Sequence, residues 1–124
     1  RPRPFACVEE KDGDKVVVVD RGMLAAALRR VGLASDLNLA TFLDFGQNQL
    51  TITARSAEVG DAREQLPVQY GGEPIHVCCN WQYLLDFLDA ARGPTVTLTL
   101  KDPTSPMLLA NGLAFINVIM LMRA

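Results

Sequence analysis

Few side chains in this sequence could do chemistry. His76 is the only histidine, and it lies in a predicted strand with no second ligand at a metal-binding spacing. Asp86 and Asp89 fall on one face of a predicted helix, where paired carboxylates could act as acid and base, but a solvated helix surface explains them equally well. The sequence therefore predicts a protein without catalytic residues, metal ligands or cofactors, although an enzyme with an unrevealed site stays open as a minor alternative.

The three cysteines give little support for redox chemistry. Cys78 and Cys79 are neighbours in a predicted strand, and neighbouring strand residues point to opposite faces, which disfavours a disulfide between them. Cys7 completes an odd number without metal-binding spacing. We therefore expect buried free thiols in a reducing compartment, hence the cytosol.

Composition narrows the class of protein. A chain of 124 residues with 49% apolar content predicts one globular domain with a core of its own. A net charge of −2 argues against binding nucleic acid by bulk electrostatics, but it leaves room for loose contact through a local basic face. The chain opens Arg-Pro-Arg-Pro without methionine or signal peptide, so we expect a piece of a longer protein.

The elements that position these residues begin after a proline-rich start. Residues 1–15 are expected to form a linker or the start of a first hairpin. A strand over 16–19 leads to Asp20, a good helix N-cap, and apolar spacing predicts a helix over 22–33. Alternating residues then predict strands at 40–45, 49–55 and 62–70, with Pro67 indicating a sheet edge.

The same pattern starts again after Gly71-Gly72. A strand at 75–79, a cap at Asn80, a helix over 81–92 and a strand at 95–100 follow in order. The apolar stripe of the first helix recurs 60 residues later: Leu24, Ala27, Leu28 and Val31 become Leu84, Phe87, Leu88 and Ala91. We expect an α+β fold of two strand-helix-three-strand repeats, about 16–70 and 75–124, with both helices on one face of a continuous sheet.

The C-terminal run 103–122 contains no charged residue. Its length would suit a membrane helix, but prolines and asparagines interrupt it. Asn111-Gly112 between apolar runs is a strong hairpin signal, so we expect strands ending at 110 and spanning 113–122. Because both faces of the last strand are apolar, it should lie centrally in the sheet or be ready to receive a partner.

The outer faces of the two predicted helices carry several charged residues. The first offers Arg21, Arg29 and Arg30; the second offers Gln82, Asp86, Asp89 and Arg92. These faces could be ordinary solvated surfaces. They could also form a weakly basic surface that meets phosphates without reading sequence.

Four segments resemble a known family. They are LAAALRRVGLAS, NQLTITARSAEVGDAREQLPVQYGGEPIHVCCNWQYLLDFLDA, VTLTLKDPTSPMLL and the ending VIMLMRA. Over 16–124 they look like the third, C-terminal domain of the bacterial DNA polymerase III beta subunit, the sliding clamp, whereas residues 1–15 match poorly.

The resemblance implies a homodimeric ring with three such domains in each subunit. Duplex DNA would pass through the hole without being read, helices would line it, and a polymerase tied to the ring would stay processive. Arg29, Arg30 and Arg92 are then candidates for phosphate contact. No membrane is involved. The alternative is a free-standing clamp-like domain that binds proteins but does not encircle DNA.

The resemblance also implies an apolar pocket beside the C-terminus, partly walled by a preceding domain. It would receive short peptide motifs from DNA polymerases, the clamp loader and repair proteins. The matching positions are Tyr83, Thr104, Pro106, Val118, Ile119, Met120, Leu121, Met122 and Arg123. The family commonly ends Met-Pro-Met-Arg-Leu, so Leu121 and Ala124 depart from it, which bears on peptide preference more than on fold.

Overall fold

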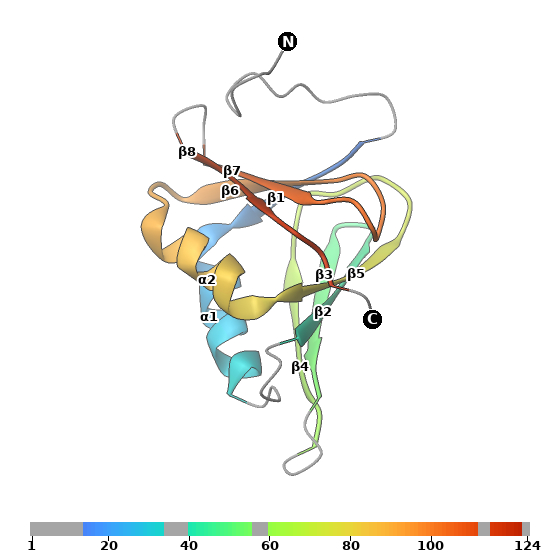
Figure 1. The fold of residues 1–124 in the computed structure, drawn as a ribbon, viewed down its shortest axis with the longest axis vertical. Helices are drawn as coiled ribbons and strands as arrows, with labels where there is room; N and C mark the ends of the chain where they lie inside the picture. Colours follow the sequence, from blue (N-terminus) through green and yellow to red (C-terminus); the bar gives the residue numbers. More distant parts are fainter. Residues whose placement is uncertain (1–13, 34–39, 56–59, 112–114, 123–124) are drawn as a thin grey trace.

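The computed structural model of the protein describes residues 14–33, 40–55, 60–111 and 115–122 (Figure 1). Its elements are β1 (Lys15–Asp20), α1 (Arg21–Gly32), β2 (Ala40–Gly46), β3 (Gln49–Ala54), β4 (Ala62–Pro67), β5 (Ile75–Asn80), α2 (Trp81–Ala90), β6 (Thr95–Leu100), β7 (Met107–Asn111) and β8 (Phe115–Ile119). The order is the predicted one: strand, helix, three strands, twice. Residues 1–13 of the expected linker, which include Cys7, lie outside the described residues, as do Arg123 and Ala124, whereas Lys15 already belongs to β1.

The strands form two four-stranded antiparallel sheets, in the orders β1-β6-β7-β8 and β4-β3-β2-β5. Each sheet takes three strands from one repeat and the first strand of the other. Figure 1 shows the two helices lying together on one side of the strands. Because the first strands are exchanged, neither repeat can complete its sheet alone.

The prediction of one continuous sheet is wrong. In the described part of the chain, two single bridges join the sheets: Val18 with Gln69, and Cys78 with Met122. Gln69 N–H donates to the Val18 carbonyl at 2.8 Å, and Met122 N–H donates to the Cys78 carbonyl at 2.7 Å. Twist accumulates from strand to strand, so two smaller sheets wrap the helices better than one wide layer does.

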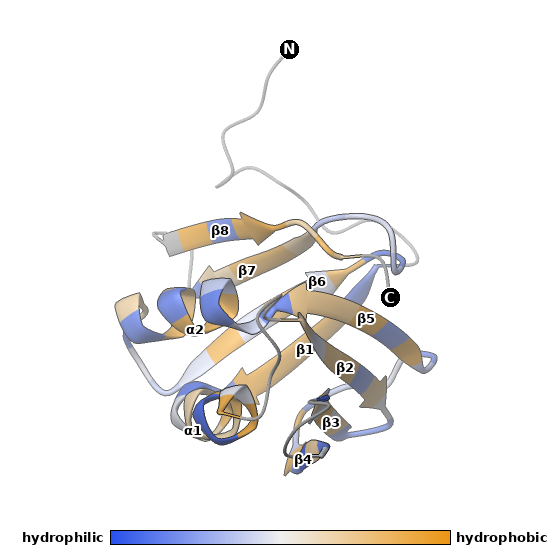
Figure 2. Ribbon diagram, turned by 60° about the horizontal axis from the view of Figure 1, so that its bottom comes forward, coloured by the Kyte–Doolittle hydropathy of each residue, from blue (hydrophilic) through white to orange (hydrophobic). Residues whose placement is uncertain are grey.

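The two helices are amphipathic as predicted, and their stripes form the core. Leu24, Leu28, Leu84 and Leu88 are fully buried. Asp20 accepts a hydrogen bond from Met23 N–H at 2.8 Å, and Asn80 caps the second helix in the same way. In Figure 2 the helix ribbons alternate between polar and apolar turns, whereas apolar colours dominate β1 and β5. Removing these stripes from water is the main force that holds the layers together.

The first residue of each helix meets the last turn of the other. Arg21 donates from Nε to the Gly93 carbonyl at 2.8 Å and from Nη1 to the Leu88 carbonyl at 3.1 Å. The bond to Leu88 satisfies a carbonyl in the last turn of α2 that has no intrahelical partner, and the bond to Gly93 fixes the connection that follows the helix. Periodicity alone places Arg21 toward solvent, but it is half-buried because the neighbouring helix end supplies two acceptors.

Helix α2 ends two residues earlier than the predicted 92. Ala91 is extended (ψ 160°), Gly93 has a positive φ of 89°, and Pro94 follows, so the helix cannot continue. Arg92 therefore lies in the connection to β6 rather than on the helix, which corrects its predicted position. Its backbone N–H donates to Asn111 Oδ1 at 3.0 Å.

The C-terminal run forms a hairpin and not a membrane helix. Strand β7 pairs antiparallel with β8, and Asn111 stands opposite Phe115. No helix in the described part of the chain is long and apolar enough to cross a membrane. The last strand is shorter than the predicted 113–122, because the chain leaves the sheet after Ile119 and turns toward Cys78. Strand β8 forms an edge of its sheet and is open to a partner.

Candidate functional site

A hollow of about 530 Å3 lies beside the C-terminal segment, and we call it the C-terminal hollow. Its lining combines the predicted residues Thr104, Leu121 and Met122 with four residues that were not predicted to line a pocket. These are His76, Val77, Cys78 and Pro103. The predicted end of the chain is thus brought against the outer side of β5.

Strand β5 and the chain end hold this wall together through their backbones. Met122 N–H donates to the Cys78 carbonyl, and this bond lays residues 121–122 along the edge of β5. The side chains of Leu121 and Met122 are then free to line the hollow while their backbone is fixed. Substituting Met122 by a smaller residue therefore changes the hollow without removing the bridge.

The opposite wall is a turn organised by Asp102. Asp102 Oδ1 accepts hydrogen bonds from Thr104 N–H at 2.8 Å and from Thr104 Oγ1 at 2.7 Å. Ser105 donates to the same carboxylate from its backbone N–H and from its hydroxyl. These bonds, led by the one from the Thr104 hydroxyl, lower the pKa of Asp102 to about 2. The carboxylate is therefore charged at neutral pH and keeps Thr104 in place.

The two vicinal cysteines face opposite ways, as the strand geometry predicts, and both are free and buried. Cys79 points into the core, where burial raises its pKa to about 12. Cys78 lines the C-terminal hollow, and burial raises its pKa as well. Both thiols are therefore neutral at physiological pH, and Cys78 contributes a small apolar surface to the hollow.

A second hollow of about 460 Å3 lies between α2 and β8, and we call it the helix hollow. It contains the predicted residues Tyr83, Val118, Ile119 and Met120. It also contains Asp86, Phe87, Ala90 and Asn117. Tyr83 and Met120 are 61% and 68% exposed, unusually high for large apolar side chains. Because Met120 lines this hollow and Leu121 lines the next, consecutive residues connect the two.

Two predicted pocket residues do not join these hollows. Pro106 is exposed and lines neither of them, and Arg123 lies outside the described residues. The position of Cys78 follows the internal repeat, because it stands 60 residues after Val18. Val18 makes the corresponding bridge in the first repeat.

The predicted DNA-facing arginines of α1 lie on the surface, but each is paired within the chain. Arg29 Nη2 lies 2.5 Å from Asp89 Oδ1 on α2, and Arg30 Nη2 lies 2.8 Å from Glu64 Oε1 on β4. The hydrogen bond from Arg30 lowers the pKa of Glu64. Water screens surface pairs of this kind and they contribute little to stability, so a competing phosphate could displace the carboxylates at small cost.

Comparison with known proteins identifies the family. Residues 10–123 match the family model described as DNA polymerase III beta subunit, C-terminal domain. A beta sliding clamp from Caulobacter vibrioides is 31% identical over 102 residues, which cover 82% of this chain. The solved DNA polymerase III subunit beta from Pseudomonas aeruginosa superposes with a TM-score of 0.86 at 30% identity over 98% of this chain.

A third similar structure is the Pseudomonas aeruginosa sliding clamp bound to griselimycin, with a TM-score of 0.86 and 29% identity. The match covers 100% of the present chain and 34% of the Pseudomonas chain. The chain spans 27% of the length of the Caulobacter relative and 34% of the first Pseudomonas structure. Sequence, fold and secondary-structure order agree, and the chain therefore belongs to the DNA polymerase III beta subunit family, in which it corresponds to the C-terminal domain.

Proposed function

We propose that this chain is one domain of a ring that encircles duplex DNA and docks replication and repair proteins through short peptides. One observation carries the docking part: consecutive residues 117–122 line two hollows, and Tyr83 and Met120 are exposed at the helix hollow. We call these two hollows together the docking groove, and such a pair suits an extended peptide that places alternate side chains in separate pockets.

The composition of the groove fits several partners rather than one. Methionine side chains adapt their shape to different apolar groups, and Met120 and Met122 lie at the two hollows. Cys78 and Leu121 add further apolar surface. Partners would include DNA polymerase, the clamp loader and repair proteins. The bound griselimycin in a relative of the same fold supports a ligand-accepting surface in this family.

The ring is proposed from the length of the relatives and from the surfaces of this domain. The chain covers 34% of a solved relative, which leaves room for two further domains of this size in each subunit. Strand β4 is an open sheet edge, and Leu33 beside the end of α1 is 90% exposed. Both features suit contact with another subunit, as a homodimer requires. Arg29 and Arg30 would then face DNA phosphates without reading bases.

A peptide titration tests the docking function. A fluorescent peptide with the clamp-binding motif of a polymerase is titrated against the chain, against Met122→Ala and against Gln65→Ala, an exposed residue on β4. We expect saturable binding that Met122→Ala weakens about fivefold or more through lost apolar contact, and that Gln65→Ala leaves unchanged. Absence of saturable binding, or equal binding by all three proteins, would contradict the proposal.

A further inference from the structure

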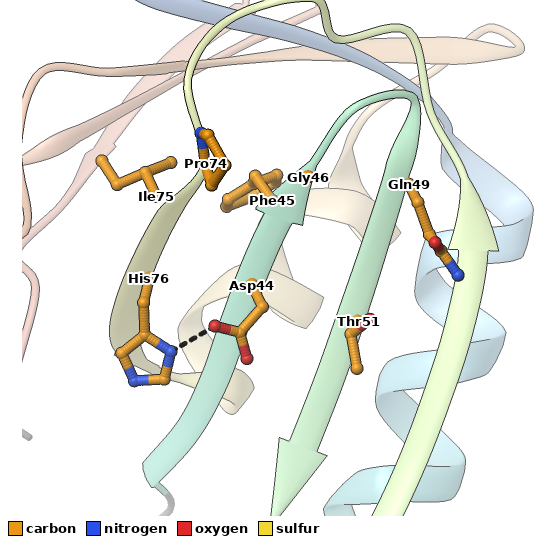
Figure 3. Close-up of a pocket in the computed structure, with 8 residues that line it drawn as sticks. All are labelled: Asp44, Phe45, Gly46, Gln49, Thr51, Pro74, Ile75 and His76. Carbon is orange, nitrogen blue, oxygen red and sulfur yellow. Dashed lines mark hydrogen bonds and ion pairs between the residues drawn. The ribbon is translucent and has the colours of Figure 1, made fainter.

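A third hollow, of about 320 Å3, opens where the ends of β2, β3 and β5 meet (Figure 3). We call it the polar hollow, because the side chains of Asp44, Gln49, Thr51 and His76 line it. Among the described residues that line it, Asp44 is the one acid. Figure 3 shows the His76 ring turned toward the Asp44 carboxylate, and the two groups are 2.5 Å apart between Nδ1 and Oδ1.

His76 is the wall that this polar hollow shares with the C-terminal hollow. Its ring is stacked on Phe42, with centroids 5.5 Å apart and planes 16° from parallel. The Arg55 guanidinium covers the Phe42 ring at 5.1 Å. The stack and the contact with Asp44 hold the imidazole between the two hollows, which therefore adjoin each other at this one side chain.

We propose that the docking groove extends past His76 into this polar hollow, where Asp44 accepts an arginine that flanks the apolar motif of the docked peptide. The inference rests on the proposed docking function and adds a specificity-determining residue to it. Asp44 would favour partners whose motif has an arginine nearby, whereas the two apolar hollows accept any suitable motif.

The distances along β5 fit a short peptide extension. Cys78 is bridged to Met122 in the C-terminal hollow, and His76, opposite Asp44, stands two residues further along the strand. At about 3.3 Å per extended residue, the two hollows lie two to four peptide residues apart. A side chain at that spacing from the motif can reach Asp44 while the motif stays in place.

The chemistry of the hollow favours arginine. The contact with His76 uses Oδ1 of Asp44, and Oδ2 can still accept a guanidinium hydrogen bond. Thr51, the cross-strand partner of Asp44, adds an oxygen acceptor beside it, and the aliphatic stem of arginine can lie against Ile75 and Pro74. Because the Asp44 side chain is 49% exposed, the gain should be modest, about two- to fivefold in Kd.

The test uses three kinds of peptide against the 124-residue chain. One carries the apolar motif alone; the second carries one arginine two, three or four residues from the motif on either side; the third replaces that arginine by the neutral isostere citrulline. Each peptide is titrated against wild type, Asp44→Asn and Asp61→Asn. The Asp61→Asn variant is the matched control, because it removes the charge of an exposed aspartate that does not line the hollow. Binding of the motif peptide by Asp44→Asn shows that this variant is folded.

We expect one arginine position to tighten binding about two- to fivefold over citrulline in wild type and Asp61→Asn, and to give no gain in Asp44→Asn. Raising the salt concentration should reduce the gain. If the motif peptide binds but no arginine position improves it, or if the gain persists in Asp44→Asn, the inference is wrong and the docking function stands. If no peptide binds, the docking function is wrong and the inference fails with it.

Discussion

Gly32 in the last turn of α1 lies directly against the indole of Trp81, the first residue of α2. A methyl group at position 32 would come within 2.7 Å of the ring. Arg21 makes the matching contact at the other end of the helix pair, where its guanidinium caps α2. The two helices are thus joined at both ends by the first residue of each.

Replacing Gly32 by alanine should destabilise the protein. Alanine is normally better than glycine inside a helix by roughly 1 kcal/mol, but the clash with Trp81 should outweigh this and give a net loss of about 1–3 kcal/mol in the free energy of unfolding. Urea denaturation measures it. Gly22→Ala in the same helix is the control, since its added methyl would meet Asp20 at an ordinary 3.5 Å. A Gly32→Ala protein as stable as wild type would refute the tight contact.

Removing the hydroxyl of Thr41 should not weaken the fold. Thr41 is fully buried, and its Oγ1 has no hydrogen-bond partner among the described residues. A buried hydroxyl without a partner costs about 1–3 kcal/mol, so Thr41→Val should leave stability unchanged or raise it by about 1 kcal/mol. Thermal denaturation of both proteins checks this. A lower melting temperature for the valine variant would mean that the hydroxyl has a stabilising partner.

Local features of the fold could be predicted from the sequence, whereas contacts between segments far apart in the chain could not. The stripes at Leu24 and Leu84 and the caps at Asp20 and Asn80 are local patterns, and all were predicted correctly. The division into two sheets depends on β1 pairing with β6, a contact between residues about 80 apart that periodicity does not encode. The early end of α2 was missed because Ala91 is buried like a helix residue.

The residues of the candidate site likewise fall into those that were predicted and those that were not. Tyr83 and Met120 follow from the resemblance to the family, and the structure places them on one rim. His76 and Cys78 were not predicted as site residues, because their role depends on Met122 crossing from another sheet. A single strand sequence cannot reveal which distant segment will lie beside it.

The Asp102 turn predicts a pH dependence at acidic pH. Its pKa falls from an ordinary 3.8 to about 2 in the folded protein, so folding is favoured while the carboxylate is charged. This stabilisation is present above pH 3.8 and is lost as pH falls toward 2. Melting temperatures measured from pH 5 to pH 2 should therefore fall less steeply in Asp102→Asn than in wild type. Parallel curves would show that the Thr104 and Ser105 hydrogen bonds do not stabilise the charged form.

The arginines of α1 predict a phenotype only in the longer protein that forms the ring. Replacing Arg29 and Arg30 together by glutamine should shorten retention on circular DNA, more so at higher salt, because fewer phosphates are neutralised. The control replaces Arg55 and Arg63 by glutamine, two exposed arginines of which the first follows β3 and the second lies on β4. Equal retention of both variants would mean that α1 does not face the duplex.

The location of the docking groove is the central claim, and a backbone-amide NMR titration tests it most directly. The isotope-labelled chain is titrated with a polymerase-derived clamp-binding peptide while its amide signals are followed. We predict that the largest shifts fall on Cys78, Thr104 and residues 117–122. Shifts confined to α1 and β4, or no shifts at all at saturating peptide, would contradict the account.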